Sequence, residues 1–186
     1  MTDKIRIAGQ DDVPALYDLL QQSYAPLARE GVHFTITRSP VGRVAQAVAS
    51  QTTFLLEREV VGGGTALAAT LTVRFPWSPE GNRLTPWPFL HWFAVAPAFK
   101  RQGLGNVLLD HVETQFLRAQ VKAPATWLAT AVNHPWLAPF YERHGYEPFH
   151  RSTNALGTPL VWLRKILIPE LYSEPVAAGA RDPQAA

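Results

Sequence analysis

The pattern of apolar and polar positions predicts that helices and strands are mixed from the start of the chain. A short alternating segment at 4–8 predicts a strand. Apolar residues then recur at helical spacing within 13–20 and again within 41–48. We expect Ser39 to cap the second helix and Pro40 to occupy its first position.

The middle of the chain is expected to form a hairpin, a loop, a strand and a helix. Strand-like runs at 52–61 and 65–75 flank a triple glycine and predict an antiparallel hairpin. The proline-rich segment 76–88 predicts a loop. The apolar run 89–95 predicts a strand buried on both faces. Apolar residues at every fourth position of 104–116 predict a helix after it.

The last third of the chain repeats the order of strand and helix and then closes with strands. The run 126–132 predicts a buried strand, and 137–144 predicts a shorter helix. Gly145 is expected at the C′ position of that helix, where a left-handed backbone ends it. The segments 146–150 and 158–166 predict the final strands.

These elements predict one α+β (mixed α/β) domain over 1–172, followed by a disordered tail at 173–186. A chain of 186 residues with 47% hydrophobic and 17% charged residues can bury the core of a single domain.

The net charge of +2, without clustered basic residues, argues against a nucleic-acid partner. The lack of cysteine excludes disulfides, thiolate catalysis and cysteine-based zinc sites. No long apolar stretch or signal-peptide pattern is found, so we expect a cytoplasmic protein that does not bind membranes.

A basic junction with two glycines lies between the strand at 89–95 and the following helix. Its sequence is "KRQGLG", from Lys100 to Gly105. The first N–H groups of a helix lack internal partners and attract anions, and glycine permits close approach to them. Lys100 and Arg101 add full positive charges beside these groups. The junction therefore predicts a site for a phosphate or pyrophosphate.

Two common phosphate loops do not match this junction. The dinucleotide fingerprint G-x-G-x-x-G fails because position 108 is leucine. The nucleotide-binding P-loop fails because no Gly-Lys-Ser/Thr follows the glycines. A nucleotide-phosphate binder therefore has little support, although the helix end itself would accept such a ligand.

The segment "VAPAFKRQGLG" resembles the acyl-CoA signature of the GNAT N-acetyltransferase superfamily, in which [Arg/Gln]-x-x-Gly-x-[Gly/Ala] follows a strand that ends in Val-x-Pro. Lys100 stands where the family has arginine or glutamine. The later segment "NHPWLAPFYERHGYEPF" is similar to the second signature of the family. Asn133 and Tyr141 are one residue further apart in it than the usual spacing.

The resemblance implies a central mixed, mostly antiparallel twisted sheet of about seven strands, flanked by about four helices, with a splayed strand pair at the acyl-CoA site. It implies acetyl-CoA as co-substrate, without a metal. Homodimers are common in the family, and the oligomeric state stays open. The residues expected to hold acetyl-CoA are Phe93, Ala94, Val95, Lys100, Arg101, Gln102, Gly103, Leu104, Gly105, Asn106, Asn133 and Phe140.

Acetyl transfer to an amine needs a base for the amine proton and an acid for the departing thiolate. The context "FYERHGY" makes Tyr141 the candidate acid, although a tyrosine on an apolar helix face also packs in cores. His91 is the candidate base, with His134 as the second choice, because histidine titrates near neutral pH. A route through water stays open. The backbone N–H of Val95 or its neighbour is the candidate donor to the oxyanion.

The acceptor is expected to be a primary amine on a small molecule, attacked directly in a ternary complex. Antibiotics, amino acids, polyamines and protein N-termini all stay open as acceptors. A non-catalytic acyl-CoA sensor is the alternative from a different functional class. The aromatic residues that could line the acceptor pocket, or equally belong to the core or to a dimer contact, are Phe34, Trp77, Trp87 and Trp92.

Overall fold

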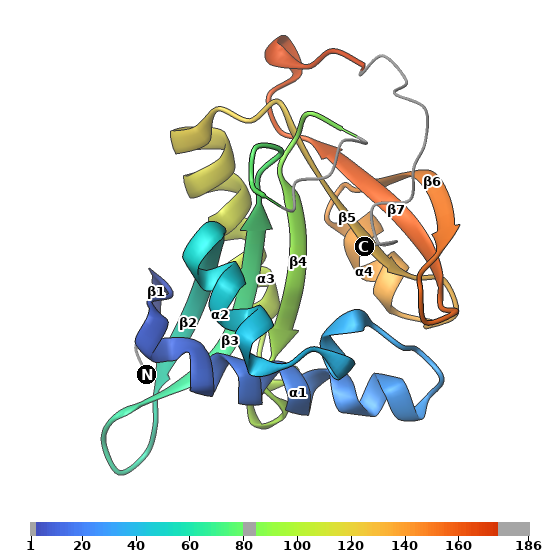
Figure 1. Cartoon of the computed structure of the whole chain (residues 1–186). Coiled ribbons are helices and arrows are strands. Elements are labelled where there is room, and N and C mark those ends of the chain that lie inside the picture. The colour runs from blue at the N-terminus through green and yellow to red at the C-terminus, as the bar shows by residue number, and fades with distance from the viewer. Residues whose placement is uncertain (1–2, 80–84, 175–186) are drawn as a thin grey trace.

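The computed structural model describes residues 3–79 and 85–174, and a seven-stranded sheet forms its centre (Figure 1). The strand order is β1-β2-β3-β4-β5-β7-β6, and all neighbours are antiparallel except the parallel pair β4 and β5. The predicted mixed, mostly antiparallel sheet is confirmed. The strands are β1 (Asp3–Ile7), β2 (Thr52–Glu59), β3 (Thr65–Arg74), β4 (Phe89–Val95), β5 (Ala125–Ala131), β6 (Glu147–Thr153) and β7 (Pro159–Ile166).

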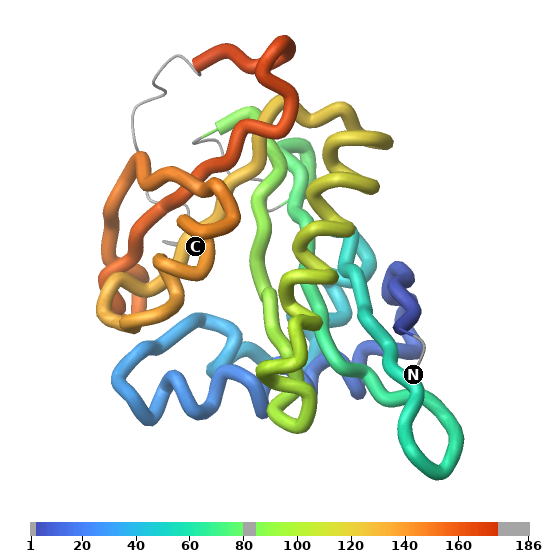
Figure 2. Tube along the Cα trace, turned by 180° about the vertical axis from the view of Figure 1, so that it is seen from behind, coloured from blue at the N-terminus to red at the C-terminus, as the bar shows by residue number. Residues whose placement is uncertain are grey.

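The helices lie on both faces of the sheet. Figure 1 shows α1 and α2 in front of the strands, and Figure 2, seen from behind, shows α3 on the opposite face. None of the helices in the described ranges is long and apolar enough to cross a membrane. The α-helices are α1 (Val13–Arg29), α2 (Val41–Ser50), α3 (Leu104–His111) and α4 (Leu137–Arg143). The short 3-10 segments are η1 (Gln10–Asp12), η2 (Thr35–Arg38), η3 (Pro97–Phe99) and η5 (Pro169–Leu171).

Two helix boundaries differ from the prediction. Pro40 has extended backbone angles and is the N-cap, so α2 begins one residue later than expected. The helix α3 continues without a break into a π-helical segment, η4 (Val112–Val121), which ends at Lys122 with a φ of 58°. The segment η4 buries Val112, Glu113 and Leu117, whereas Phe116 of the predicted apolar face is only half-buried, because a π-helix has more residues per turn than an α-helix.

The apolar stripes of the helices form a core on each face of the sheet. Each Å² of apolar surface buried in these cores stabilises the fold by roughly 25 cal/mol. On one face α1 and α2 pack against Leu55 and Ala94. On the other face α3 packs against strand residues that include Leu71, Val73 and Leu90.

The strands β4 and β5 pair over a short distance and then diverge (Figure 1). Their register joins only Phe89 to Trp127 and Leu90 to Leu128. The predicted splayed pair is therefore present. The prediction that β4 is buried on both faces is wrong at 91–93, because these half-buried residues face the gap.

A bulge bends β4 where the gap opens. Trp92 and Phe93 of β4 lie opposite the single residue Leu71 of β3, and Trp92 has a φ of 51°. A left-handed backbone is uncommon for a bulky residue and is tolerated when the surrounding structure fixes it. The bulge redirects the edge of β4 toward the gap.

The wide end of the gap is closed by hydrogen bonds between the segment after α1 and the β6–β7 hairpin. The His33 amide donates to Thr158 Oγ1 at 2.9 Å, and Asn154 Nδ2 donates to the His33 carbonyl at 2.7 Å. Strand pairing closes the narrow end.

The predicted tail lies outside the described residues from 175 onward. The first two residues of the predicted tail, 173 and 174, lie within the described part of the chain. Glu174 forms an ion pair with Arg164, with 2.7 Å between Oε2 and Nη1. The boundary of the predicted domain at 172 stays a prediction.

Candidate active site

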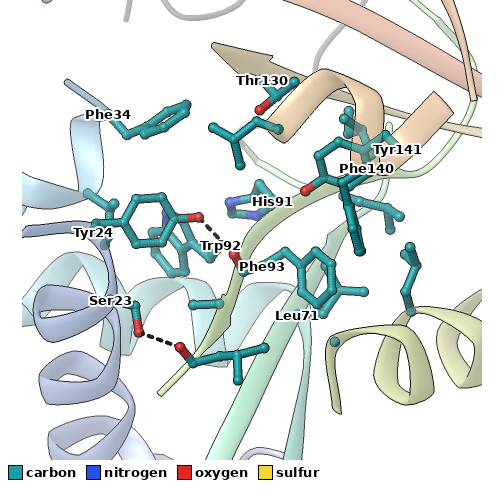
Figure 3. A pocket seen from close by; sticks show the side chains of 18 of the residues that line it. Ser23, Tyr24, Phe34, Leu71, His91, Trp92, Phe93, Thr130, Phe140 and Tyr141 are labelled. Atoms are coloured by element: carbon teal, nitrogen blue, oxygen red, sulfur yellow. Dashed lines mark hydrogen bonds between the residues drawn. The ribbon is translucent and has the colours of Figure 1, made fainter. Parts of the chain in front are cut away.

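A cavity of about 1180 Å³ occupies the gap between β4 and β5. Its walls come from the end of α1, the segment 34–39, the bulged part of β4, the junction 99–106, and α4. Figure 3 shows aromatic side chains converging on this space from α1, β4 and α4. A cavity with apolar walls and a few polar groups is typical of a small-molecule site.

The predicted anion site lies at one end of this cavity. Gly103 is the N-cap of α3, with a φ of 77°, and Arg101 also has a left-handed backbone, with a φ of 63°. The first bond of α3 runs from the Val107 amide to the Gly103 carbonyl at 3.1 Å. The N–H groups of 104–106 precede this bond and lie at the positive end of the helix dipole. These groups fit a pyrophosphate.

The side chains around the helix end agree only in part with the predicted set. Lys100 and Arg101 line the cavity together with the residues from Gly103 to Asn106. Gln102 is not among the described lining residues; its Oε1 accepts a hydrogen bond from Arg58 Nη1 at 2.5 Å instead. Asn133 is exposed in the turn after β5 and also does not line the cavity.

The exposed edge of β4 is bonded to α1. Tyr24 Oη donates to the Phe93 carbonyl at 3.2 Å, and Ser23 Oγ donates to the Val95 carbonyl at 3.3 Å (Figure 3). Each carbonyl has a second lone pair for a ligand. Sequence reasoning missed both hydroxyl groups. Tyr24 follows Tyr17 by seven residues, so extending the helical periodicity by two turns would have placed it on the same face.

Tyr141 lies in α4 with its hydroxyl directed into the cavity (Figure 3). Its ring lies 5.1 Å from that of Phe140 and 6.4 Å from that of Phe93. The hydroxyl makes no hydrogen bond with any residue in the described ranges. Burial raises the pKa of Tyr141 above its ordinary value of 10.0, and Tyr24 adds to this. The hydroxyl therefore holds its proton at neutral pH and can act as a donor.

His91 lies on β4 at the deep wall of the cavity. Its Nε2 is 2.6 Å from Gln51 Oε1, so Nε2 holds the ring proton and Nδ1 keeps the lone pair. Desolvation, followed by the positive charges of Arg74 and Arg43, lowers the pKa of His91 well below its ordinary value of 6.5. The ring is therefore neutral at pH 7. His134 is not among the described lining residues; it binds Glu30 at 3.0 Å.

The lowered pKa of His91 predicts a pH dependence of stability. Below about pH 6.5 the unfolded chain binds a proton that folded His91 rejects. The free energy of unfolding should therefore be largest above pH 6.5 and decrease as the pH falls from 6.5 toward the pKa of the folded state. His91→Asn should make the unfolding midpoint less dependent on pH between 5 and 7.

Urea denaturation at several pH values measures this effect. His111→Asn, a change on α3 at the opposite face of the sheet, is the control and should keep the dependence of the original chain. An unchanged dependence in His91→Asn would show that other groups produce it.

The four aromatic residues predicted to line an acceptor pocket lie in different surroundings. Phe34 and Trp92 line the cavity. Trp77 is a correction: it is 76% exposed and stacks on Phe75, with 4.6 Å between the ring centroids. Trp87 is also a correction, because it is buried in the core next to Trp127, whose Nε1 donates to the Trp87 carbonyl at 3.0 Å.

Comparisons with known proteins agree with this geometry. The family model described as acetyltransferase (GNAT) domain matches residues 49–148. The chain is 36% identical to S-alkylcysteine N-acetyltransferase of Bacillus subtilis (strain 168), over 97% of this chain and 98% of that protein. It is 30% identical to S-(2-succino)cysteine N-acetyltransferase of the same organism, over 92% of this chain and 100% of that protein.

Solved structures share the fold at low sequence identity. The PaiA N-acetyltransferase from Thermoplasma acidophilum in complex with coenzyme A has a TM-score of 0.68 at 12% identity, over 89% of this chain and 99% of that chain. The ribosomal-protein-S18-alanine N-acetyltransferase from Escherichia coli has a TM-score of 0.64 at 18% identity, over 92% and 100% of the two chains. The splayed strands agree with the family model and with the relatives. The chain belongs to the GNAT acetyltransferase family and is an N-acetyltransferase.

Proposed function

We propose that the protein transfers an acetyl group from acetyl-CoA to the α-amino group of an S-substituted cysteine. The observation that carries this proposal is the gap between β4 and β5, which joins an anion site at the start of α3 to a pocket beside α1 and α2. The two curated relatives, which match nearly the whole chain, are by name N-acetyltransferases of such cysteine derivatives. The cavity supports a reaction between two bound substrates, and the names of the relatives support a small amino acid as acceptor.

The residues of the junction are suited to hold the pyrophosphate of acetyl-CoA. Lys100 and Arg101 supply positive charge, and the N–H groups of 104–106 supply donors. A Cβ at Gly105 would already touch Phe93 Cζ at 3.4 Å, so a larger side chain there would separate this end of α3 from β4. The N–H and C=O groups along the edge of β4 are suited to the pantetheine arm.

The reaction requires that one proton leave the amine and one proton reach the sulfur. Bound acetyl-CoA supplies an activated acyl carbon and a thiolate leaving group. The amine forms the new N–C bond as the C–S bond breaks. In our proposal His91 Nδ1, directly or through water, accepts the amine proton, while Tyr141 donates its hydroxyl proton to the sulfur. Tyr141 then regains a proton through solvent.

An assay with an acceptor panel tests the proposal. The protein is incubated with acetyl-CoA and S-methyl-L-cysteine, S-benzyl-L-cysteine, spermidine or an alanine-terminated peptide, and both CoA release and the acetylated product are measured. We expect N-acetylated S-substituted cysteines, with kcat/KM at least about 10-fold above that for spermidine, since one or two specific polar contacts provide such discrimination.

The other outcomes separate the alternatives. Acetylation of spermidine or the peptide, without acetylation of any cysteine derivative, would reject the proposed acceptor. If no amine is acetylated although acetyl-CoA raises the Tm, the sensor alternative is supported. Greater stabilisation by ATP than by acetyl-CoA would support a nucleotide-phosphate binder.

A further inference from the structure

Two arginines line the cavity on the side away from the anion site. Arg43 comes from α2, and Arg74 is the last residue of β3; both are half-buried. Val73 belongs to the core beneath α3, and successive strand residues point to opposite faces. Arg74 therefore points to the face that α1 and α2 cover, whereas Lys100 and Arg101 lie at the start of α3.

These two side chains line the same cavity as the candidate base. The Arg74 Cζ atom lies 4.8 Å from the centroid of the Phe89 ring, which in turn stacks on His91 at 5.7 Å. Gln51, the partner of His91, also lines the cavity. Both guanidinium groups contribute to lowering the pKa of His91, which agrees with their position beside it. A group bound by the arginines would therefore lie next to the imidazole.

The charge of the cavity wall favours an anionic acceptor. Among the described residues that line the cavity there is no aspartate or glutamate. Partly desolvated positive charges stabilise a bound carboxylate and repel an ammonium group that an acceptor carries in addition to its reacting amine. A polyamine, whose remote ammonium groups need acidic partners, does not suit this wall. The cationic side chains on it are Arg43, Arg74, Lys100, Arg101 and Arg143.

We infer that Arg43 and Arg74 bind the α-carboxylate of the acceptor and thereby hold its amine beside His91 and the bulge of β4. The planar guanidinium group matches a carboxylate with two parallel hydrogen bonds, which fixes orientation as well as position. The apolar side chains of Phe34 and Trp92, which line the same side, then contact the substituent on sulfur. The inference rests on the proposed function and narrows the acceptors to amino acids with a free α-carboxylate.

The test compares one acceptor in three forms: S-methyl-L-cysteine, its carboxamide, and the decarboxylated amine 2-(methylthio)ethylamine. The original chain should prefer the acid over both analogues by about 10- to 100-fold in kcat/KM, mainly through KM, as expected when a charged contact is lost. Arg43→Gln and Arg74→Gln should each reduce kcat/KM for the acid by about 10- to 100-fold and change that for the amide by less than about 3-fold.

Controls separate a lost contact from a damaged fold. Arg38→Gln removes an exposed arginine of η2 that is not among the described lining residues, and it should keep the preference for the acid. Arg43→Lys and Arg74→Lys keep the charge and should recover part of the activity on the acid. Stabilisation by acetyl-CoA should be the same in all variants, because their changes lie away from the junction.

The outcomes distinguish this inference from the proposed function. If the original chain acetylates S-methylcysteine and its amide equally well, or if the glutamine variants lose activity on both acceptors equally, the carboxylate site is rejected while the proposed function stands. If no S-substituted cysteine is acetylated, the proposed function fails and the inference fails with it.

Discussion

Replacement of Tyr141 by phenylalanine is expected to lower kcat for acetyl transfer by about 100- to 1000-fold, the usual contribution of a general acid. The hydroxyl points into the cavity and keeps its proton, because burial raises its pKa. The phenylalanine ring should keep the contacts with Phe93, Phe140 and Tyr146. The Kd of acetyl-CoA, measured by isothermal titration calorimetry, should therefore change by less than about 2-fold.

Tyr24 provides a matched control on the opposite wall of the cavity. Its hydroxyl donates to the Phe93 carbonyl, so Tyr24→Phe removes a phenol that is already bonded within the protein. We expect kcat to fall by less than about 10-fold, since a single neutral hydrogen bond contributes about 1 kcal/mol. Equal losses in the two variants would indicate that Tyr141 supports the structure of the cavity, and an unchanged kcat in Tyr141→Phe would exclude it as the acid.

Gly105→Val is expected to weaken acetyl-CoA binding by about 10- to 100-fold, because overpacking costs about 1 to 3 kcal/mol. A Cβ at this position would lie 3.4 Å from Phe93 Cζ and 3.5 Å from Val95 Cγ2, and the valine methyl groups extend beyond it. They would separate the start of α3 from β4 and displace the amides suited to the pyrophosphate. Valine is no worse than glycine in a helix, so the helix itself should still form.

The control for this variant is Gly42→Val in α2, where an added Cβ meets no atom within 4 Å. Thermal shift with acetyl-CoA and calorimetry should give the same Kd for Gly42→Val as for the original chain. The Kd of acetyl-CoA for Gly105→Ala should lie between the values for Gly42→Val and Gly105→Val. Tight binding of acetyl-CoA by Gly105→Val would mean that the ligand does not approach this turn of α3.

Local signals were sufficient to predict the donor side of the site. The run 89–95 coincides with β4, because a continuous apolar segment between a proline-rich loop and a glycine turn leaves few choices for a strand. The glycines at 103 and 105 and the helical period after them predicted the start of α3, where the proposed anion site lines the cavity. Local signals could not predict that Gln102 and Asn133 are not among the described residues that line the cavity. The direction of a side chain depends on distant partners, such as Arg58 in the case of Gln102.

The acceptor side could not be predicted, because it is formed by residues that are far apart in sequence. Arg43 and Arg74 belong to a helix and a strand that meet only in the folded chain. The loop tryptophans could not be assigned from the sequence: their size indicates either packing or ligand contact, and the structure shows packing, with Trp87 covered by core residues and Trp77 stacked on a neighbouring ring. The left-handed bulge at Trp92 has no pattern in the sequence, since glycine would be expected there.

The gap between β4 and β5 has a consequence for how the two substrates bind. Strand pairing closes its narrow end, and the hydrogen bonds of His33 with the β6–β7 hairpin close its wide end. The anion site lies at the start of α3, and the two arginines lie on the face that α1 and α2 cover. In our proposal acetyl-CoA and the acceptor therefore occupy different parts of one cavity. Because these two parts do not overlap, both substrates can be bound at the same time, as the proposed direct transfer in a ternary complex requires.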